Sequence, residues 1–327
     1  MNPYVEAARP KTLFNALAPV VMGTGAGIAG SVEYAETLQA NGHEPLAAHP
    51  VSLISFVLLA LVVATSATVA VNYANDLFDG VAGNDSPDRT GPRRAVAAGL
   101  VTPQAMTRAL MIAMAVFIGS GLALIVLAQA WVLLPIGIIC CLLLYAYSGG
   151  PYPLASHALG EVAVFLTFGL AATMGTAYGL NGLPWYGLAY AIGIGGFSCA
   201  VLEANNIRDI PEDSANGKHT LAVRLGDKQA RNVYTGLVLL PYLVTIWKCV
   251  ELAGKSINHP GMYAAFLPAC ALLSFPLAYR GIARVRSGAS GQALIPVLAS
   301  TGLAMTVWAL LMAVTITLSA ILLSPQF

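Results

Sequence analysis

Charged residues are scarce in this sequence of 327 residues: Asp, Glu, Lys and Arg make up only 9% of it, whereas hydrophobic residues make up 57%. A soluble domain carries about 25% charged residues, so this composition excludes an ordinary soluble protein. The net charge of +1 indicates no nucleic-acid partner, because domains that bind nucleic acids are strongly basic. The composition therefore predicts an integral membrane protein surrounded by the lipid bilayer.

Cysteine is also sparse, with five residues that lack the spacing of metal ligands. All five lie in or beside apolar segments, where a free cysteine is typically a small buried hydrophobic side chain. No cleavable signal peptide is expected, because residues 1–11 are polar and the apolar run after them leads into further apolar segments.

Long apolar stretches recur along the whole chain. A helix needs about 20 mostly apolar residues to cross a bilayer, and nine stretches meet this requirement. We expect an all-α, multi-pass membrane protein with a single domain over residues 1–327. The predicted spans are residues 13–31, 51–74, 105–127, 130–147, 159–179, 185–206, 232–250, 262–280 and 293–322.

The distribution of positive charge predicts the orientation of these spans. Of the 16 Lys and Arg residues, all but Lys248 and Lys255 fall on the side that holds the N-terminus and the loops after every even-numbered span. Positive charge accumulates on the cytoplasmic side of membrane proteins. The N-terminus is therefore predicted to be cytoplasmic, in a cell (inner) membrane.

Two short acidic clusters follow the second and the sixth predicted spans, at residues 72–79 and 205–213. Each begins Asn-x-x-x-Asp and adds a second carboxylate three or four residues later. On a helix, both spacings place the three side chains on one face. The two sets are Asn72, Asp76 and Asp79, and Asn205, Asp209 and Asp213.

Carboxylates grouped at the ends of membrane helices repel one another and the negative helix terminus. Mg²⁺ would relieve this repulsion, since it binds carboxylates together with water and phosphate oxygens. The alternative is that these are ordinary solvated acids of two loops. Because the pattern occurs twice on the same predicted side, we favour a magnesium site formed by Asp76, Asp79, Asp209 and Asp213.

Basic residues come directly after both clusters, notably Arg94 after the first and Lys218 after the second. Arg and Lys beside a metal site are suited to binding the free oxygens of a diphosphate. Lys11, together with Arg9, precedes the first span and could reach the same cavity. The alternative is that these cations serve only as topology signals.

A diphosphate that enters a membrane cavity would carry an apolar tail, as a prenyl diphosphate does. Its departure would leave an allylic cation, stabilised electrostatically and protected from water until a nucleophile is alkylated. Tyr147 and Tyr152 could line this cavity, or belong to an interfacial belt. Glu161 could orient an aromatic substrate, or favour the N-terminus of its own helix.

These segments resemble the paired aspartate-rich motifs of the UbiA superfamily of intramembrane prenyltransferases. Within it, the sequence is similar to the 1,4-dihydroxy-2-naphthoate polyprenyltransferases of menaquinone synthesis, chiefly through Arg-x-Gly-Pro and Gly-Gly-Pro-Tyr-Pro-Leu. The resemblance extends over most of the chain. The segments that carry it are residues 8–13, 75–92, 147–154 and 205–226.

The resemblance implies nine transmembrane helices around a central cavity, with the active site on the cytoplasmic side. It assigns the four aspartates as ligands of Mg²⁺ and diphosphate, with Asn72 and Asn205 supporting them. It gives Asp85 the last acidic position of the first motif and Lys218 a contact to diphosphate. The implied partners are a polyprenyl diphosphate and dihydroxynaphthoate.

The implied reaction transfers the polyprenyl group to dihydroxynaphthoate with loss of CO₂, which gives a demethylmenaquinone. One alternative is another acceptor, such as 4-hydroxybenzoate, homogentisate or a glycerol phosphate. A more distant alternative is a transporter lined with carboxylates, since intramembrane acids also mark ion pathways. The second span argues against it, because residues 51–71 contain no charged residue.

Overall fold

The computed structural model describes residues 2–42, 45–83, 94–183, 185–255 and 260–323. All regular structure within these ranges is helical, which confirms the predicted fold class. Eight long helices account for most of it. They are α2 (Phe14–Glu33), α4 (Pro50–Ala82), α5 (Pro103–Ala128), α6 (Leu133–Ser148), α9 (Leu188–Ala215), α11 (Asp227–Lys255), α12 (Pro260–Arg286) and α13 (Ile295–Leu323).

The fifth predicted span is one continuous helix with a π-helical middle. It consists of α7 (Gly160–Val164), the π-helical η4 (Phe165–Ala172) and α8 (Thr173–Asn181). Short helical segments complete the described chain. They are α1 (Pro3–Ala7), η1 (Pro10–Thr12), α3 (Ala35–Ala40), η2 (Leu46–Ala48), η3 (Leu154–His157), α10 (Leu221–Leu225) and η5 (Gly291–Leu294).

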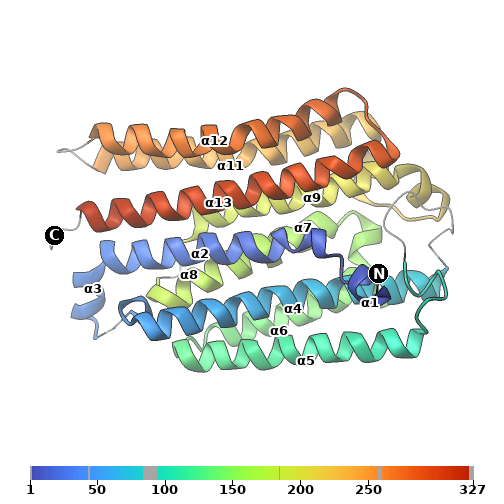
Figure 1. Ribbon diagram of the computed structural model, residues 1–327, viewed down its shortest axis with the longest axis horizontal. Helices are drawn as coiled ribbons and strands as arrows, with labels where there is room; N and C mark the ends of the chain where they lie inside the picture. Colours follow the sequence, from blue (N-terminus) through green and yellow to red (C-terminus); the bar gives the residue numbers. More distant parts are fainter. Residues whose placement is uncertain (1, 43–44, 84–93, 184, 256–259, 324–327) are drawn as a thin grey trace.

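The long helices run lengthwise through an elongated molecule (Figure 1). The N-terminal α1 lies at the end where α4 and α9 finish, and α13 finishes at the opposite end. Both acidic clusters therefore occur at the same end of the helices. The sequence predicts this end to be cytoplasmic.

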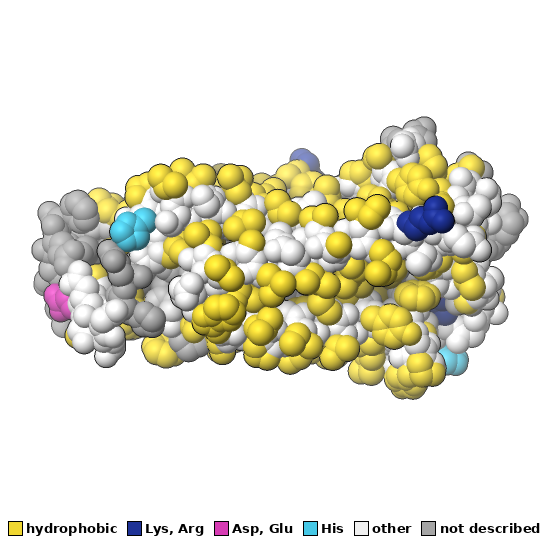
Figure 2. Space-filling view, turned by 90° about the horizontal axis from the view of Figure 1, so that it is seen from below, with side chains coloured by type: hydrophobic (Ala, Val, Ile, Leu, Met, Phe, Trp, Pro, Cys, Tyr) yellow, Lys and Arg dark blue, Asp and Glu magenta, His cyan; other side chains and the backbone are white. Residues whose placement is uncertain are grey.

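Seven helices of the described chain are long and apolar enough to cross a membrane, and α6, with 16 residues, is a shorter apolar helix. The prediction of a multi-pass membrane protein is thus confirmed, while the count of nine crossings stays a prediction. Large apolar side chains such as Val51, Leu142 and Leu272 are exposed. Figure 2 shows apolar side chains covering the middle of one face, with most of its few charged side chains towards the ends.

Two helices extend beyond the spans that apolar length predicts. α4 continues to Ala82 instead of ending near residue 74, and α9 continues to Ala215 instead of ending near residue 206. Gly83 ends α4 in the left-handed conformation, with a φ of 69°. After α9, Gly217 takes a φ of 71° and the Lys218 N–H donates to the carbonyl of Asp213. The acidic clusters are thus parts of helices.

Small residues let the helices approach closely at several crossings. A Cβ atom on Gly25 of α2 would lie 2.5 Å from the Cα of Ala313 in α13. Close packing through small residues is a major source of cohesion between membrane helices, where lipid supplies no hydrophobic driving force. Between α13 and α11, the buried Trp308 donates from its indole nitrogen to the hydroxyl of Thr245 at 3.0 Å.

We expect Gly25→Ala to destabilise the fold by about 1–3 kcal/mol, because the added methyl group overpacks the contact with Ala313. Gly236→Ala in α11 is the matched control, since a Cβ there meets nothing within 4 Å. It should leave stability unchanged or raise it by up to about 1 kcal/mol through helix propensity. Thermal unfolding in detergent measures both; equal midpoints for the two variants would contradict the assigned contact.

Candidate active site

Two adjoining cavities open between the helices near the acidic clusters. The polar cavity has a volume of about 350 Å³ and contains acidic, basic and amide side chains. The apolar cavity has a volume of about 490 Å³ and is lined mainly by aliphatic side chains of α4, α5, α6 and η4. Five residues line both cavities and form the junction between them. They are Arg9, Asn75, Tyr147, Leu202 and Asn205.

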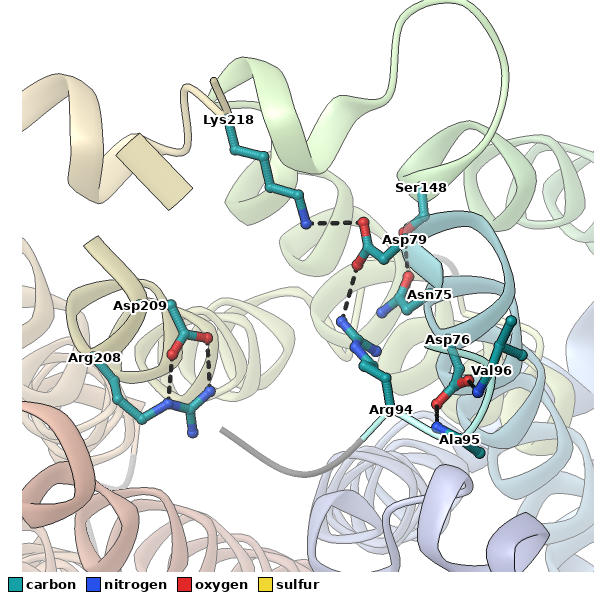
Figure 3. Close-up of polar contacts among 10 residues, drawn as sticks. All are labelled: Asn75, Asp76, Asp79, Arg94, Ala95, Val96, Ser148, Arg208, Asp209 and Lys218. Carbon is teal, nitrogen blue, oxygen red and sulfur yellow. Dashed lines mark hydrogen bonds and ion pairs between the residues drawn. The ribbon is translucent and has the colours of Figure 1, made fainter. Parts of the chain in front are cut away.

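Asp79 is the acidic centre of the first cluster in the polar cavity. Its carboxylate accepts hydrogen bonds from Arg94 at 2.9 Å and from Lys218 at 2.8 Å. Lys218 follows α9, whereas Asp79 lies on α4, so this contact joins the two predicted clusters (Figure 3). Buried charges require such pairing, because an isolated charge in apolar surroundings is strongly unfavourable.

Asp76 has a different environment from Asp79. It is 1% exposed, and its two carboxylate oxygens accept the backbone N–H groups of Ala95 and Val96 at 2.9 and 2.8 Å. These bonds fix the segment that begins with Arg94 (Figure 3). Asp76 lines neither cavity. Its role as a metal ligand stays a prediction, and it would require the carboxylate to leave these backbone donors.

The second cluster supplies Asp209 and Asp213, which both line the polar cavity. Arg208 forms a bidentate ion pair with Asp209, with N–O distances of 2.6 and 2.7 Å. Arg208 also lines this cavity, and the sequence reasoning did not single it out. Its position directly before Asp209 was the available signal, since neighbouring residues near a helix end can share one cavity.

Asn72 holds the N-terminal segment against α4. Its side-chain nitrogen donates to the carbonyl of Ala8 at 2.9 Å and to the hydroxyl of Thr12 at 3.1 Å. Between these two residues, Arg9 adopts a left-handed conformation with a φ of 52° and reaches the junction of the cavities. A non-glycine residue in this conformation is strained and often marks a functional site.

The segment after α6 closes one side of the polar cavity. A Cβ on Gly149 would lie 2.8 Å from the ring of Phe78, and Gly150 has a φ of 77°. Both positions therefore require glycine, which explains the Gly-Gly pair in the sequence. The hydroxyl of Ser148 donates to the Asn75 side chain, so this segment is also attached to α4 (Figure 3).

Of the remaining residues that the sequence predicted for the site, some line the cavities and others do not. Tyr147 and Asn205 line both cavities. Tyr152 is 55% exposed and stacks on the ring of His157, outside both linings. Glu161 is buried behind the cavity wall and also lines neither cavity. Asp85 and the side chain of Lys11 lie outside the described part of the chain.

The polar cavity suits a hard divalent cation that is bound together with a ligand. It offers the carboxylates of Asp79, Asp209 and Asp213. Among the described residues, however, no three acidic, histidine or cysteine side chains converge into a closed metal cage. Mg²⁺ is usually held by one or two carboxylates plus substrate phosphates, so these residues fit that ion in the presence of a diphosphate.

Comparison with known proteins identifies the family. A profile of the UbiA prenyltransferase family matches residues 45–288. A Mycobacterium tuberculosis protein named 1,4-dihydroxy-2-naphthoate octaprenyltransferase is 42% identical over 312 residues, which cover 95% of each chain. The Escherichia coli protein of the same name is 35% identical over 247 residues, which cover 72% of each chain.

Solved structures share the fold. A UbiA homologue from Archaeoglobus fulgidus bound to DMAPP and Mg²⁺ has a TM-score of 0.62 at 14% identity, and the match covers 98% of this chain and 99% of the other. The form of that protein bound to GPP and Mg²⁺ has a TM-score of 0.61. Together with the sequence relatives, these findings show that the chain belongs to the UbiA prenyltransferase family.

Proposed function

We propose that this protein transfers a polyprenyl group from a polyprenyl diphosphate to 1,4-dihydroxy-2-naphthoate, with loss of CO₂, and forms a demethylmenaquinone in its reduced, quinol form. The observation that carries this proposal is a charged cavity joined to an apolar cavity through five shared residues. One ligand with an anionic head and an apolar tail matches both cavities. The acceptor is inferred from the relatives named as naphthoate prenyltransferases, which match 95% and 72% of this chain.

The diphosphate group would occupy the polar cavity. Arg94 and Lys218 now form ion pairs with Asp79. When the diphosphate enters the cavity, they would bind its negatively charged oxygens instead. Mg²⁺, held by Asp79, Asp209 and Asp213, would supply positive charge to the departing diphosphate. This agrees with the two structures of the Archaeoglobus fulgidus homologue, which contain Mg²⁺ with GPP or with DMAPP.

The reacting carbon would lie at the junction of the cavities. The bond between the prenyl carbon and the diphosphate oxygen breaks, and both electrons leave with the diphosphate. The ring carbon then forms a bond to the prenyl carbon, and the electrons of its bond to the carboxylate return to the ring as CO₂ departs. Tyr147 lines this junction, and its ring face would stabilise a nearby cation.

The apolar cavity would hold the first part of the prenyl tail and exclude water from the cation. Most of its lining is aliphatic and cannot be alkylated by the cation. We further propose that the polar cavity faces the cytoplasm in the inner membrane. The concentration of Lys and Arg on that side of the predicted topology supports this orientation.

A panel of acceptors tests the proposed substrate. Purified protein with Mg²⁺ and a polyprenyl diphosphate should prenylate 1,4-dihydroxy-2-naphthoate and release pyrophosphate and CO₂. Mass spectrometry of the product should give the mass of the prenylated naphthoquinol without its carboxylate. Selective prenylation of 4-hydroxybenzoate, homogentisate or a glycerol phosphate would replace the proposed acceptor.

Asp209→Asn tests the role of the second acidic cluster. The amide of asparagine carries no negative charge and cannot neutralise a divalent cation. We therefore expect turnover to fall by at least about 100-fold, which is the usual effect of removing one group that stabilises charge in a transition state. Glu36→Gln, an exposed acid on α3, is the matched control and should keep its activity. Near-normal turnover of a folded Asp209→Asn enzyme would rule out this role.

Lys218→Ala tests the contact with diphosphate. The loss of one charge-assisted hydrogen bond, about 1.5–3 kcal/mol, should raise the KM for the prenyl diphosphate by about 10- to 100-fold. The KM for the aromatic acceptor should change much less. Lys228→Ala, which removes an exposed lysine of α11, is the control; an effect of Lys218→Ala on the acceptor alone would refute the assignment.

A further inference from the structure

Two buried carboxyl groups lie behind the wall of the polar cavity, and the proposed reaction does not use them. Glu203 of α9 is 0% exposed and Glu161 of α7 is 8% exposed. Their side chains lie beside each other. Within the described chain, both oxygens of Glu203 and Oε2 of Glu161 are buried and have no hydrogen-bond partner other than the carboxyl group of the pair. Buried acids inside a membrane helix are rare and usually functional.

The remaining oxygen of this pair has one defined partner. Asn206 donates from its side-chain nitrogen to Oε1 of Glu161 at 2.7 Å. The thiol of Cys199 donates to the backbone carbonyl of Glu161 at 3.1 Å, which ties α9 to α7 at the same place. Asn206 itself lines the polar cavity. Glu161 therefore contacts a residue of the cavity wall without lining the cavity.

This hydrogen bond fixes which end of the Asn206 amide is available. A carboxylate only accepts hydrogen bonds, so the amide nitrogen must point to Glu161 and the amide oxygen must point elsewhere. That oxygen has no protein donor among the described residues. A diphosphate oxygen cannot serve as its partner, because both atoms are acceptors. The group that meets it must be a hydrogen-bond donor or a cation.

The wall of the polar cavity beside Glu161 has an apolar and aromatic part that could hold an aromatic ring next to the Asn206 amide. Gly160 lines the cavity directly before Glu161, and a Cβ there would lie 3.4 Å from Leu202 and 3.7 Å from the hydroxyl of Tyr147. The wall around Gly160 is formed by a leucine and a tyrosine, while Asp209 follows Asn206 by three residues on α9 and lines the same cavity. Such a surface suits the flat face of an aromatic diol.

We propose that Glu161 positions the Asn206 amide so that its oxygen accepts a hydrogen bond from a ring hydroxyl of the aromatic acceptor. This inference rests on the proposed function, and it makes Asn206 a binding residue and Glu161 a positioning residue. Glu203 supports Glu161 through one proton shared by the two carboxyl groups. That proton removes one of two repelling charges and pairs Glu203 with Oε2 of Glu161.

Kinetics of Asn206→Ala and Glu161→Ala test the proposal. Loss of one hydrogen bond should raise the KM for dihydroxynaphthoate by about 3- to 10-fold in each variant. The KM for the prenyl diphosphate and the Mg²⁺ concentration for half-maximal activity should stay within about 2-fold, because neither ligand uses this bond. Asn232→Ala, at an exposed asparagine of α11, is the matched control.

The double variant separates positioning from a general structural effect. If Glu161 acts through Asn206, the Glu161→Ala/Asn206→Ala enzyme should be no worse than Asn206→Ala alone. Glu161→Gln keeps an acceptor oxygen and should recover most of the acceptor affinity lost in Glu161→Ala. If Glu161→Ala does not fold, Asn206→Asp supplies the same test, since it keeps an acceptor oxygen but cannot donate to Glu161.

Several results would overturn this inference. Additive losses in the double variant would show that Glu161 acts independently of Asn206. A changed Mg²⁺ requirement with an unchanged KM for the acceptor would assign the amide oxygen to metal-bound water. Calorimetric binding of dihydroxynaphthoate separates the two proposals: equal affinity of wild type and Asn206→Ala refutes the positioning role alone. A wild type that neither binds nor prenylates this compound refutes the proposed function.

Discussion

The pairing of buried charges governs this structure. The polar cavity lies at the end of the bundle where α4 and α9 finish. Its charged side chains are surrounded by helices that carry few charges. Asp79 binds Arg94 and Lys218, and Asp209 binds Arg208. An unpaired charge here would carry a large desolvation cost. The same ion pairs could exchange partners when a ligand binds. The acids would then bind the metal ion, and the bases would bind the diphosphate.

The hydrogen bonds of Asp76, Asn72 and Asn75 build the frame around these pairs. Asp76 fixes the segment of Arg94, Asn72 fixes the segment of Arg9, and Asn75 joins α4 to the end of α6. All three residues belong to the first motif, so α4 acts as the common support for three separate parts of the wall. Such support holds charged groups in place before the substrate enters, which is the arrangement that electrostatic catalysis requires.

The sequence predicted the helical fold and the gathering of the two motifs, because apolar length and charge asymmetry are local properties that need no knowledge of packing. Apolar length placed the ends of the spans near residues 74 and 206, whereas α4 and α9 continue through the acidic clusters, as the spacing of their side chains on one helix face predicted. The sequence could not foresee that Asp76 binds backbone N–H groups of Ala95 and Val96, because such contacts depend on where another segment returns. For Tyr152 it left a cavity residue and an interfacial tyrosine as alternatives, and the structure places this tyrosine, stacked on His157 and exposed, outside both cavity linings.

A structure of the protein with Mg²⁺ and a non-hydrolysable prenyl thiolodiphosphate tests the central claim most directly. The account predicts the diphosphate in the polar cavity, with metal bound by Asp79 and Asp209 and with Lys218 turned from Asp79 to a diphosphate oxygen. The prenyl tail should enter the apolar cavity past Tyr147. A diphosphate bound elsewhere, with the ion pairs of Asp79 and Asp209 unchanged, would contradict the account.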